Sequence, residues 1–255
     1  MAEIKKRKNQ YFDYGQKRKR SALQPGLKGF FCSCNVREKD CISESYNILN
    51  EYADQLELVG SEEKANTEVD GIGDMDRLQE EIQALQSLNR HRSNKFQVLE
   101  SGAKNIVFIR TMLEDPVKLA HSIIEDIFKN KQQKTRFLIR LVPIEITCKA
   151  YLDDIKHAVE PLIHKYFGNE PKTFSICYNH RNNNNLSRDD VICAVADIVI
   201  KNNSAHKVDL KSAELSIVIE VIKNCALLSV VPDFLRYKKY NLHAICKNDE
   251  ETESK

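Results

Sequence analysis

The stretch from Phe174 to Lys223 constrains the fold most strongly, because segments of different periodicity follow one another within it. Phe174–Tyr178 is a short apolar run, which predicts a buried strand. Residues 187–201 have apolar side chains at helical spacing, and Ser187 with Asp190 three residues later predicts the start of a helix. Residues 214–222 alternate and are rich in β-branched side chains, which predicts a second strand. We therefore expect a strand–helix–strand unit here.

The residues before this unit predict an antiparallel sheet with helices on one face, because strands and helices alternate in an α+β order. The predicted strands are 27–35, 95–101, 106–111 and 137–142, and the predicted helices are 37–58 and 116–129. Residues 59–75 are acidic and contain three glycines, which predicts a mobile loop. Residues 76–88 have helical spacing, which fits a helix against the core or an exposed partner-binding helix.

The remaining elements lie around the central stretch. Residues 144–148 are expected to form an extended link, and residues 152–167 a helix that is interrupted or restarted near Pro161. Residues 226–231 are apolar and predict another strand. Arg236, Lys238 and Lys239 then form a basic segment that also carries tyrosines.

The formal net charge of +2 conceals strong segregation of charge. Residues 1–20 carry eight basic and two acidic residues, whereas residues 54–81 carry two basic and ten acidic residues. The basic clusters of the first segment are typical of a nuclear-import signal, so we expect the protein in the nucleus and specifically the nucleolus. No apolar run approaches the roughly 20 residues that cross a bilayer, so no membrane association is expected.

Catalytic chemistry has little support in the sequence. No P-loop, dinucleotide, GxSxG or HExxH pattern occurs, and neither a cofactor nor a metal is expected. Cys148 is a candidate nucleophile, but a buried, inert thiol is the favoured interpretation. Cys32 and Cys34 together with Cys41 suggest zinc, yet no fourth cysteine or histidine has the usual ligand spacing. The thiols of Cys32 and Cys34 fit packing on one strand face, which is the favoured interpretation.

RNA binding has better support, because lysine and arginine side chains neutralise phosphates. We expect Arg181 and Lys207 to lie together beside the turn at residues 207–210. The asparagines at 182–185 can bond sugar or base edges, and they equally fit a flexible turn, because asparagine tolerates unusual backbone angles. The full set of RNA-binding candidates is Arg140, Lys149, Arg181, Arg188, Lys207, Arg236, Lys238 and Lys239.

The pattern from about Pro25 to Leu242 resembles the THUMP domain family. The residues that carry the resemblance are Arg181, Ser187, Lys207-Val208-Asp209-Leu210, Cys148-Lys149-Ala150 and Tyr240-Asn241-Leu242. The ordered set is most similar to the eukaryotic THUMP-domain adaptors that assist a tRNA cytidine acetyltransferase. The resemblance implies an α/β (α+β) chain with a disordered basic tail (1–24), a ferredoxin-like domain (25–142), a THUMP domain (143–244) and an acidic disordered tail (245–255).

The resemblance also implies a function. It predicts a non-catalytic adaptor that binds tRNA and presents leucine and serine tRNAs to the RNA cytidine acetyltransferase, which forms N4-acetylcytidine in the D-arm. The short remainder after the THUMP-like region leads us to expect that a partner supplies catalysis. Two alternatives remain open: a small RNA-modifying enzyme that uses Cys148 or the Cys32/Cys34 pair, and an RNA-independent scaffold that uses residues 54–88.

Overall fold

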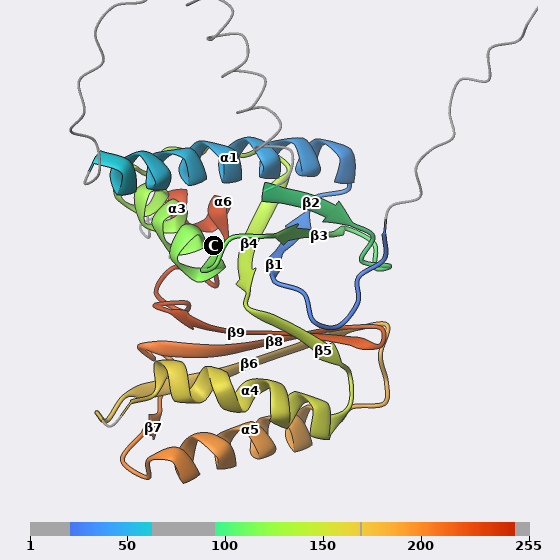
Figure 1. The fold of residues 1–255 in the computed structure, drawn as a ribbon, viewed down its shortest axis with the longest axis vertical. Coiled ribbons are helices and arrows are strands. Elements are labelled where there is room, and N and C mark those ends of the chain that lie inside the picture. Colours follow the sequence, from blue (N-terminus) through green and yellow to red (C-terminus); the bar gives the residue numbers. More distant parts are fainter. Residues whose placement is uncertain (1–20, 63–94, 169, 248–255) are drawn as a thin grey trace, which may run out of the picture.

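The computed structural model describes residues 21–62, 95–168 and 170–247 as two stacked α/β layers (Figure 1). Each layer has its own sheet, with four strands in one and five in the other. The predicted helix at 76–88 lies outside the described residues, as do residues 1–20 of the predicted basic tail (1–24) and residues 248–255 of the predicted acidic tail (245–255). The described parts of both tails are ordered, which corrects the prediction: Ala22 forms a β-bridge with Glu100, and Ile245 is buried in a short helix.

The N-terminal layer has the element order strand–helix–strand–strand–helix–strand. Its sheet runs β2-β3-β1-β4, and every neighbouring pair of strands is antiparallel. Among the described residues the order is β-α-β-β-α-β, and the ferredoxin-like assignment of this layer stays a prediction. The elements are β1 (Gly29–Cys34), α1 (Glu38–Glu62), β2 (Phe96–Leu99), β3 (Ile106–Thr111), α3 (Pro116–Asn130) and β4 (Leu138–Ile144).

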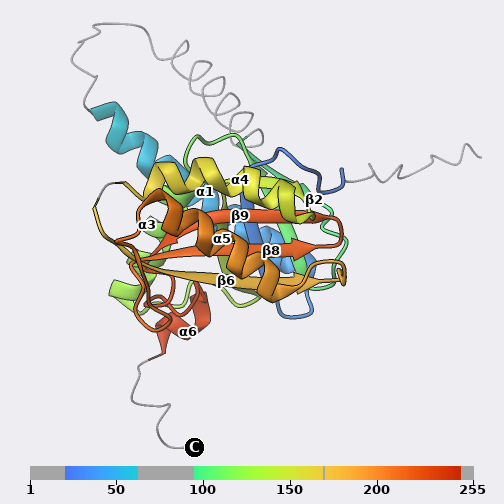
Figure 2. The ribbon, with the colours of Figure 1, turned by 90° about the horizontal axis from the view of Figure 1, so that it is seen from below.

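The C-terminal layer is a mixed sheet of order β5-β9-β8-β6-β7. Strands β6 and β8 are parallel and are joined through α5, whereas β8 and β9 form an antiparallel hairpin. Helices α4 and α5 cover one face of this sheet (Figure 2). The elements are β5 (Ile146–Lys149), α4 (Leu152–Tyr166), β6 (Thr173–Arg181), α5 (Arg188–Asn202), β7 (Lys207–Val208), β8 (Leu215–Ile222) and β9 (Cys225–Pro232).

Three predicted boundaries are wrong. Helix α1 continues to Glu62, so the loop predicted from residue 59 does not begin there. The predicted link at 144–148 is largely strand β5, which pairs with β9. Helix α4 is continuous through Pro161. Pro161 is exposed, so water can satisfy the carbonyl group one turn earlier that loses its amide partner.

The central strands of the second sheet are buried on both faces. Ile217 and Ile219 pack under α4 and α5, whereas Val218 and Ile222 belong to the apolar cluster of the N-terminal layer. All eight residues of β8 are consequently buried. The two layers thus share an apolar interface.

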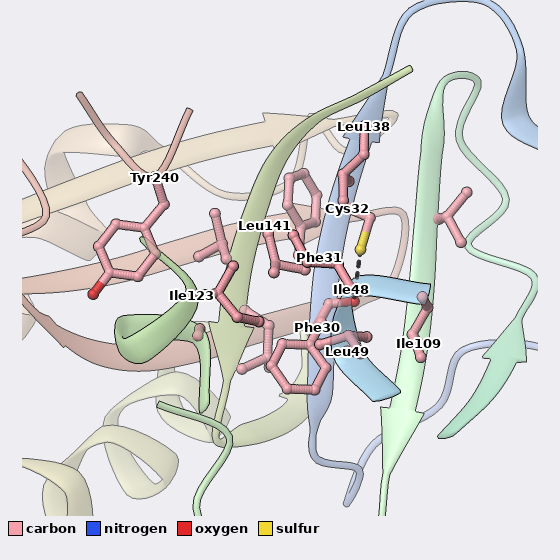
Figure 3. Packing of buried hydrophobic residues seen from close by; sticks show 14 of the residues in the cluster. Phe30, Phe31, Cys32, Ile48, Leu49, Ile109, Ile123, Leu138, Leu141 and Tyr240 are labelled. Carbon is pink, nitrogen blue, oxygen red and sulfur yellow. Dashed lines mark hydrogen bonds between the residues drawn. The ribbon is translucent and has the colours of Figure 1, made fainter. Parts of the chain in front are cut away.

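The residues after β9 return to the N-terminal layer. Phe234, Tyr237 and Tyr240 pack into its apolar cluster, and Figure 3 shows Tyr240 beside that core. A short helix that the sequence did not predict, α6 (Leu242–Cys246), follows Asn241, whose side chain accepts bonds from the first helical amides. Residues 234–246 therefore pack on the first layer although they follow the last strand of the second.

Candidate nucleic-acid interface

A hollow lies where the C-terminal end of β6, the start of α5 and strand β4 meet. It has a volume of about 350 Å³, and an adjoining hollow of about 350 Å³ shares several of its residues. Together they form what we call the cationic cleft. Its charged side chains are Arg140, Arg181, Arg188, Glu220 and Lys239, and the polar side chains of Asn179 and His180 also line it.

Local sequence explains how the second layer contributes to the cleft. Side chains alternate along β6, so Cys177 packs toward the N-terminal layer and Tyr178 toward α4 and α5. The same alternation turns Asn179 and Arg181 to the side of the cleft. Ser187 caps α5, with its hydroxyl accepting from the Asp190 amide at 3.5 Å, and so fixes Arg188 as the first helical residue.

The first layer contributes Arg140. This residue lies in β4 opposite Ser33 of β1, and it also forms a bridge with Asn241 in the returning C-terminal segment. Lys239 comes from the same segment, where it has a left-handed backbone with φ of 59°. The cleft therefore needs both layers, and the returning segment holds their parts together.

The electrostatics of the cleft are unbalanced. Among the described residues, no ion pair engages Arg140, Arg181, Arg188 or Lys239. Glu220 lies within the cleft, and its burial raises the pKa of its carboxyl group, while the Asn179 amide and the charges of Arg181 and Arg140 oppose the rise. A cleft with several uncommitted cations favours a polyanion such as RNA.

Lys149 lies at the same end of the sheet as Arg181 but outside the cleft. The register places Lys149 opposite Cys225, Cys225 opposite Ile222, and Ile222 opposite Arg181. Three strand spacings separate the two cations by roughly 14 Å. Lys149 lines a separate hollow of about 670 Å³ together with the exposed ring of Tyr151.

The prediction that Arg181 and Lys207 lie together is wrong. Strand β7 pairs Lys207 with Thr173, at the opposite end of β6 from Arg181. At about 3.3 Å per residue, the two positions are roughly 26 Å apart along the strand. The prediction failed because β6 is longer than the apolar run that suggested it, and Arg181 ends the strand.

The other two predicted residues lie in the returning segment. The Arg236 guanidinium is 3.9 Å from the Asp233 carboxylate and lies over the Phe128 ring, so it is partly engaged within the protein. Lys238 is exposed, with φ of 50°. Neither lines the cationic cleft, and RNA contacts at both stay predictions.

Sequence reasoning missed Glu220 and Asn179. The Asn179 amide donates to the Glu220 carboxylate at 2.8 Å, across neighbouring positions of β6 and β8. The sequence feature that could have indicated them is Glu220 itself, the single acidic residue at the otherwise apolar end of β8. An acidic residue in a buried strand needs a polar environment, which predicts polar side chains nearby.

The candidate nucleophiles Cys32 and Cys148 are poorly suited to catalysis. Burial raises the pKa of the Cys32 thiol to about 12, and burial together with the nearby Cys225 and Asp154 groups raises the pKa of the Cys148 thiol to about 12. Both therefore stay protonated at neutral pH, whereas a nucleophilic cysteine reacts as the thiolate. Within the described ranges, no cluster of three histidine, cysteine or acidic side chains fits a metal, and no helix is suited to span a membrane.

Comparison with known proteins decides the family. The family model of the THUMP domain matches residues 149–231. THUMP domain-containing protein 1 of Bos taurus is 40% identical over 234 residues, which is 89% of this chain and 65% of the relative. The THUMP domain-containing protein 1 homolog of Drosophila melanogaster is 38% identical over 273 residues, which is 97% of this chain and 84% of the relative.

The chain belongs to the THUMP domain-containing protein 1 family.

A more distant relative is the protein named tRNA acetyltransferase TAN1 of Saccharomyces cerevisiae, with 26% identity over 250 residues, or 88% of this chain and 86% of the relative. The chain spans about two thirds of the length of its mammalian relatives. The matched THUMP residues begin at Lys149 and end at Val231. They therefore include Asn179, Arg181 and Glu220 of the cationic cleft, whereas Arg140 and Lys239 lie outside the matched residues.

Proposed function

We propose that this protein binds tRNA through the cationic cleft and presents it to a separate RNA cytidine acetyltransferase. The observation that carries the proposal is the convergence of Arg140, Arg181 and Arg188 from three elements, with no ion pair to any residue that the structure describes. Positive side chains that are not committed within the protein can neutralise phosphates, and the release of counterions then drives binding.

The nature of the modification comes from the yeast relative, whose name specifies tRNA acetylation. We propose the role of adaptor rather than enzyme because the candidate nucleophile Cys148 is held as a thiol. The proposed product is N4-acetylcytidine in the D-arm of leucine and serine tRNAs, and the acetyltransferase is the proposed partner.

Binding is tested with purified protein and tRNA over a range of salt concentrations. Arg188→Ala should weaken binding to all tRNAs. It should also make the negative slope of log K, the binding constant, against log salt concentration shallower by about 1, because one phosphate contact is lost. The matched control is Lys201→Ala, which removes a positive charge from an exposed position in the last turn of the same helix. Equal effects of the two substitutions would contradict a phosphate site at the start of α5.

The adaptor role is tested in cells that lack the protein. We expect N4-acetylcytidine to disappear from tRNA and to persist in ribosomal RNA, and the wild-type chain but not an Arg181→Ala/Arg188→Ala variant to restore it. Mass spectrometry of purified tRNA nucleosides measures the change. Normal tRNA acetylation in the absence of the protein would end the adaptor proposal.

We also propose that the basic clusters in residues 1–20 direct the protein to the nucleus and the nucleolus. Deletion of these residues from a fluorescently tagged protein should leave it outside the nucleus. Unchanged nuclear accumulation would contradict this assignment without affecting the proposal for the cleft.

A further inference from the structure

Glu220 is unusual among the acidic residues of the cleft region, because it is buried without a cation partner. Glu220 is only 5% exposed, and its neighbours Ile219 and Val221 are fully buried. One carboxylate oxygen, Oε1, accepts a hydrogen bond from the Asn179 amide at 2.8 Å. Within the described part of the chain, no donor bonds to the second oxygen and no ion pair engages the carboxylate.

This arrangement leaves part of the carboxylate's hydrogen-bonding capacity open toward the hollow. A carboxylate can accept several hydrogen bonds, and one amide satisfies only part of that capacity. The guanidinium groups of Arg140 and Arg181 line the same hollow but stop short of ion pairs with Glu220. The second oxygen is thus an acceptor without a partner inside a hollow that favours phosphates at its rim.

We propose that Glu220 Oε2 accepts a hydrogen bond from the exocyclic amino group of an unpaired RNA base, which makes Glu220 a specificity-determining residue. The proposal rests on RNA binding in the cationic cleft. Carboxylates pair with the N4 amino group of cytosine, and proteins read unpaired RNA bases at their Watson–Crick edges. A hollow of about 350 Å³ lies within the range of roughly 300–1,000 Å³ that is usual for small-ligand sites.

The chemistry distinguishes amino-bearing bases from uracil. Cytosine, adenine and guanine each present an amino group at the edge of the ring. Uracil has a single ring N–H on that edge, and the carbonyl oxygens on either side of it repel a carboxylate. The cleft should therefore accept cytosine, adenine or guanine and disfavour uracil, while the cations hold the backbone without regard to sequence.

Fluorescence anisotropy with seven-nucleotide RNAs tests this inference. Each RNA has uridine at every position except the central one, which is cytosine, adenine, guanine or uridine. The wild-type protein should bind the three amino-bearing RNAs about tenfold more tightly than the all-uridine RNA. Glu220→Gln should abolish or invert this ratio, because Asn179 retains the acceptor oxygen and the new amide donor faces the cleft.

The matched control is Glu214→Gln, the same substitution at an exposed residue just before β8. It should keep the wild-type ratio. If Glu220→Gln does not fold, as judged by circular dichroism, Asn179→Ala decides. A Glu220 carboxylate that loses its orienting amide should discriminate severalfold less between the amino-bearing RNAs and the all-uridine RNA.

The outcomes separate this inference from the proposed function. Equal wild-type affinity for the four RNAs, or an equal loss for all of them in Glu220→Gln, would overturn the base-reading role and leave tRNA binding intact. A wild-type protein that binds none of the RNAs, nor tRNA at low salt, would overturn both.

Discussion

Glu44 offers the sharpest test of how the fold holds the cleft in place. Its side chain leaves helix α1 and accepts three backbone amides at the start of β4, the strand that carries Arg140. Arg136 N donates to Oε1 at 2.9 Å, and Phe137 N and Leu138 N donate to Oε2 at 2.8 and 2.9 Å. Glu44→Ala removes every one of these acceptors without altering the strand.

The magnitude follows from the exposure of the three amides. The Arg136 amide is exposed and can bond water, so its loss contributes little. The other two are partly buried, and a hydrogen bond to a charged group contributes about 1.5–3 kcal/mol, which we discount to about 1–2 kcal/mol each for solvent access. We expect a loss of about 2–4 kcal/mol, or a fall in Tm of roughly 4–16 °C for a fold of this size.

Urea denaturation followed by circular dichroism measures the free energy of unfolding. Glu44→Gln should lose less than Glu44→Ala, because one carbonyl acceptor remains. Asn47→Ala, at an exposed position on the same helix, should change stability by less than about 0.5 kcal/mol. A loss below 0.5 kcal/mol for Glu44→Ala would refute the view that this carboxylate secures β4.

Two further predictions concern titration. The pKa of His206 is lowered by burial and by the charge of Lys172, and its Nδ1 accepts from the Lys172 amide at 3.1 Å. The unfolded chain therefore binds the proton more readily, so the contribution of His206 to stability is full above about pH 6.5 and falls as the pH is lowered toward the folded pKa. His206→Asn should reduce the loss of unfolding free energy between about pH 7.5 and 5.5, as measured by urea denaturation. An unchanged pH profile would contradict this prediction. Cys148→Ser should leave tRNA binding and tRNA acetylation unchanged, because burial holds the thiol protonated, with a pKa of about 12; loss of acetylation with binding intact would instead favour a cysteine enzyme.

Local sequence predicted most elements because their signals are local. Asp115 before Pro116 marks the start of α3, and the Asp115 carboxylate accepts from the Val117 and Lys118 amides at 2.9 and 3.0 Å. Ser187 caps α5 as predicted. Such capping signals depend on a few neighbouring residues, so they predict a helix start without knowledge of the tertiary contacts.

The failures are all relations between distant parts of the chain. Lys207 and Arg181 are separated by the full length of β6, which depends on how far β8 continues to pair with it. The burial of both faces of β8 depends on the docking of the first layer, and the same docking creates the hollow that contains Glu220. Arg140 and Arg188 were named as RNA-binding candidates from their charge alone, and no sequence pattern indicated that they share a cleft.

The returning segment has a consequence for synthesis of the protein on the ribosome. Tyr240 donates a hydrogen bond to the Pro232 carbonyl at 3.2 Å and contacts His121 Nδ1 at 3.0 Å, and its backbone accepts from the Leu141 amide. A nascent chain that has emerged from the ribosome only as far as β4 still lacks Tyr240, which covers part of the apolar cluster of the first layer. Part of the apolar surface of the first layer therefore stays uncovered until residues 234–246 have been translated.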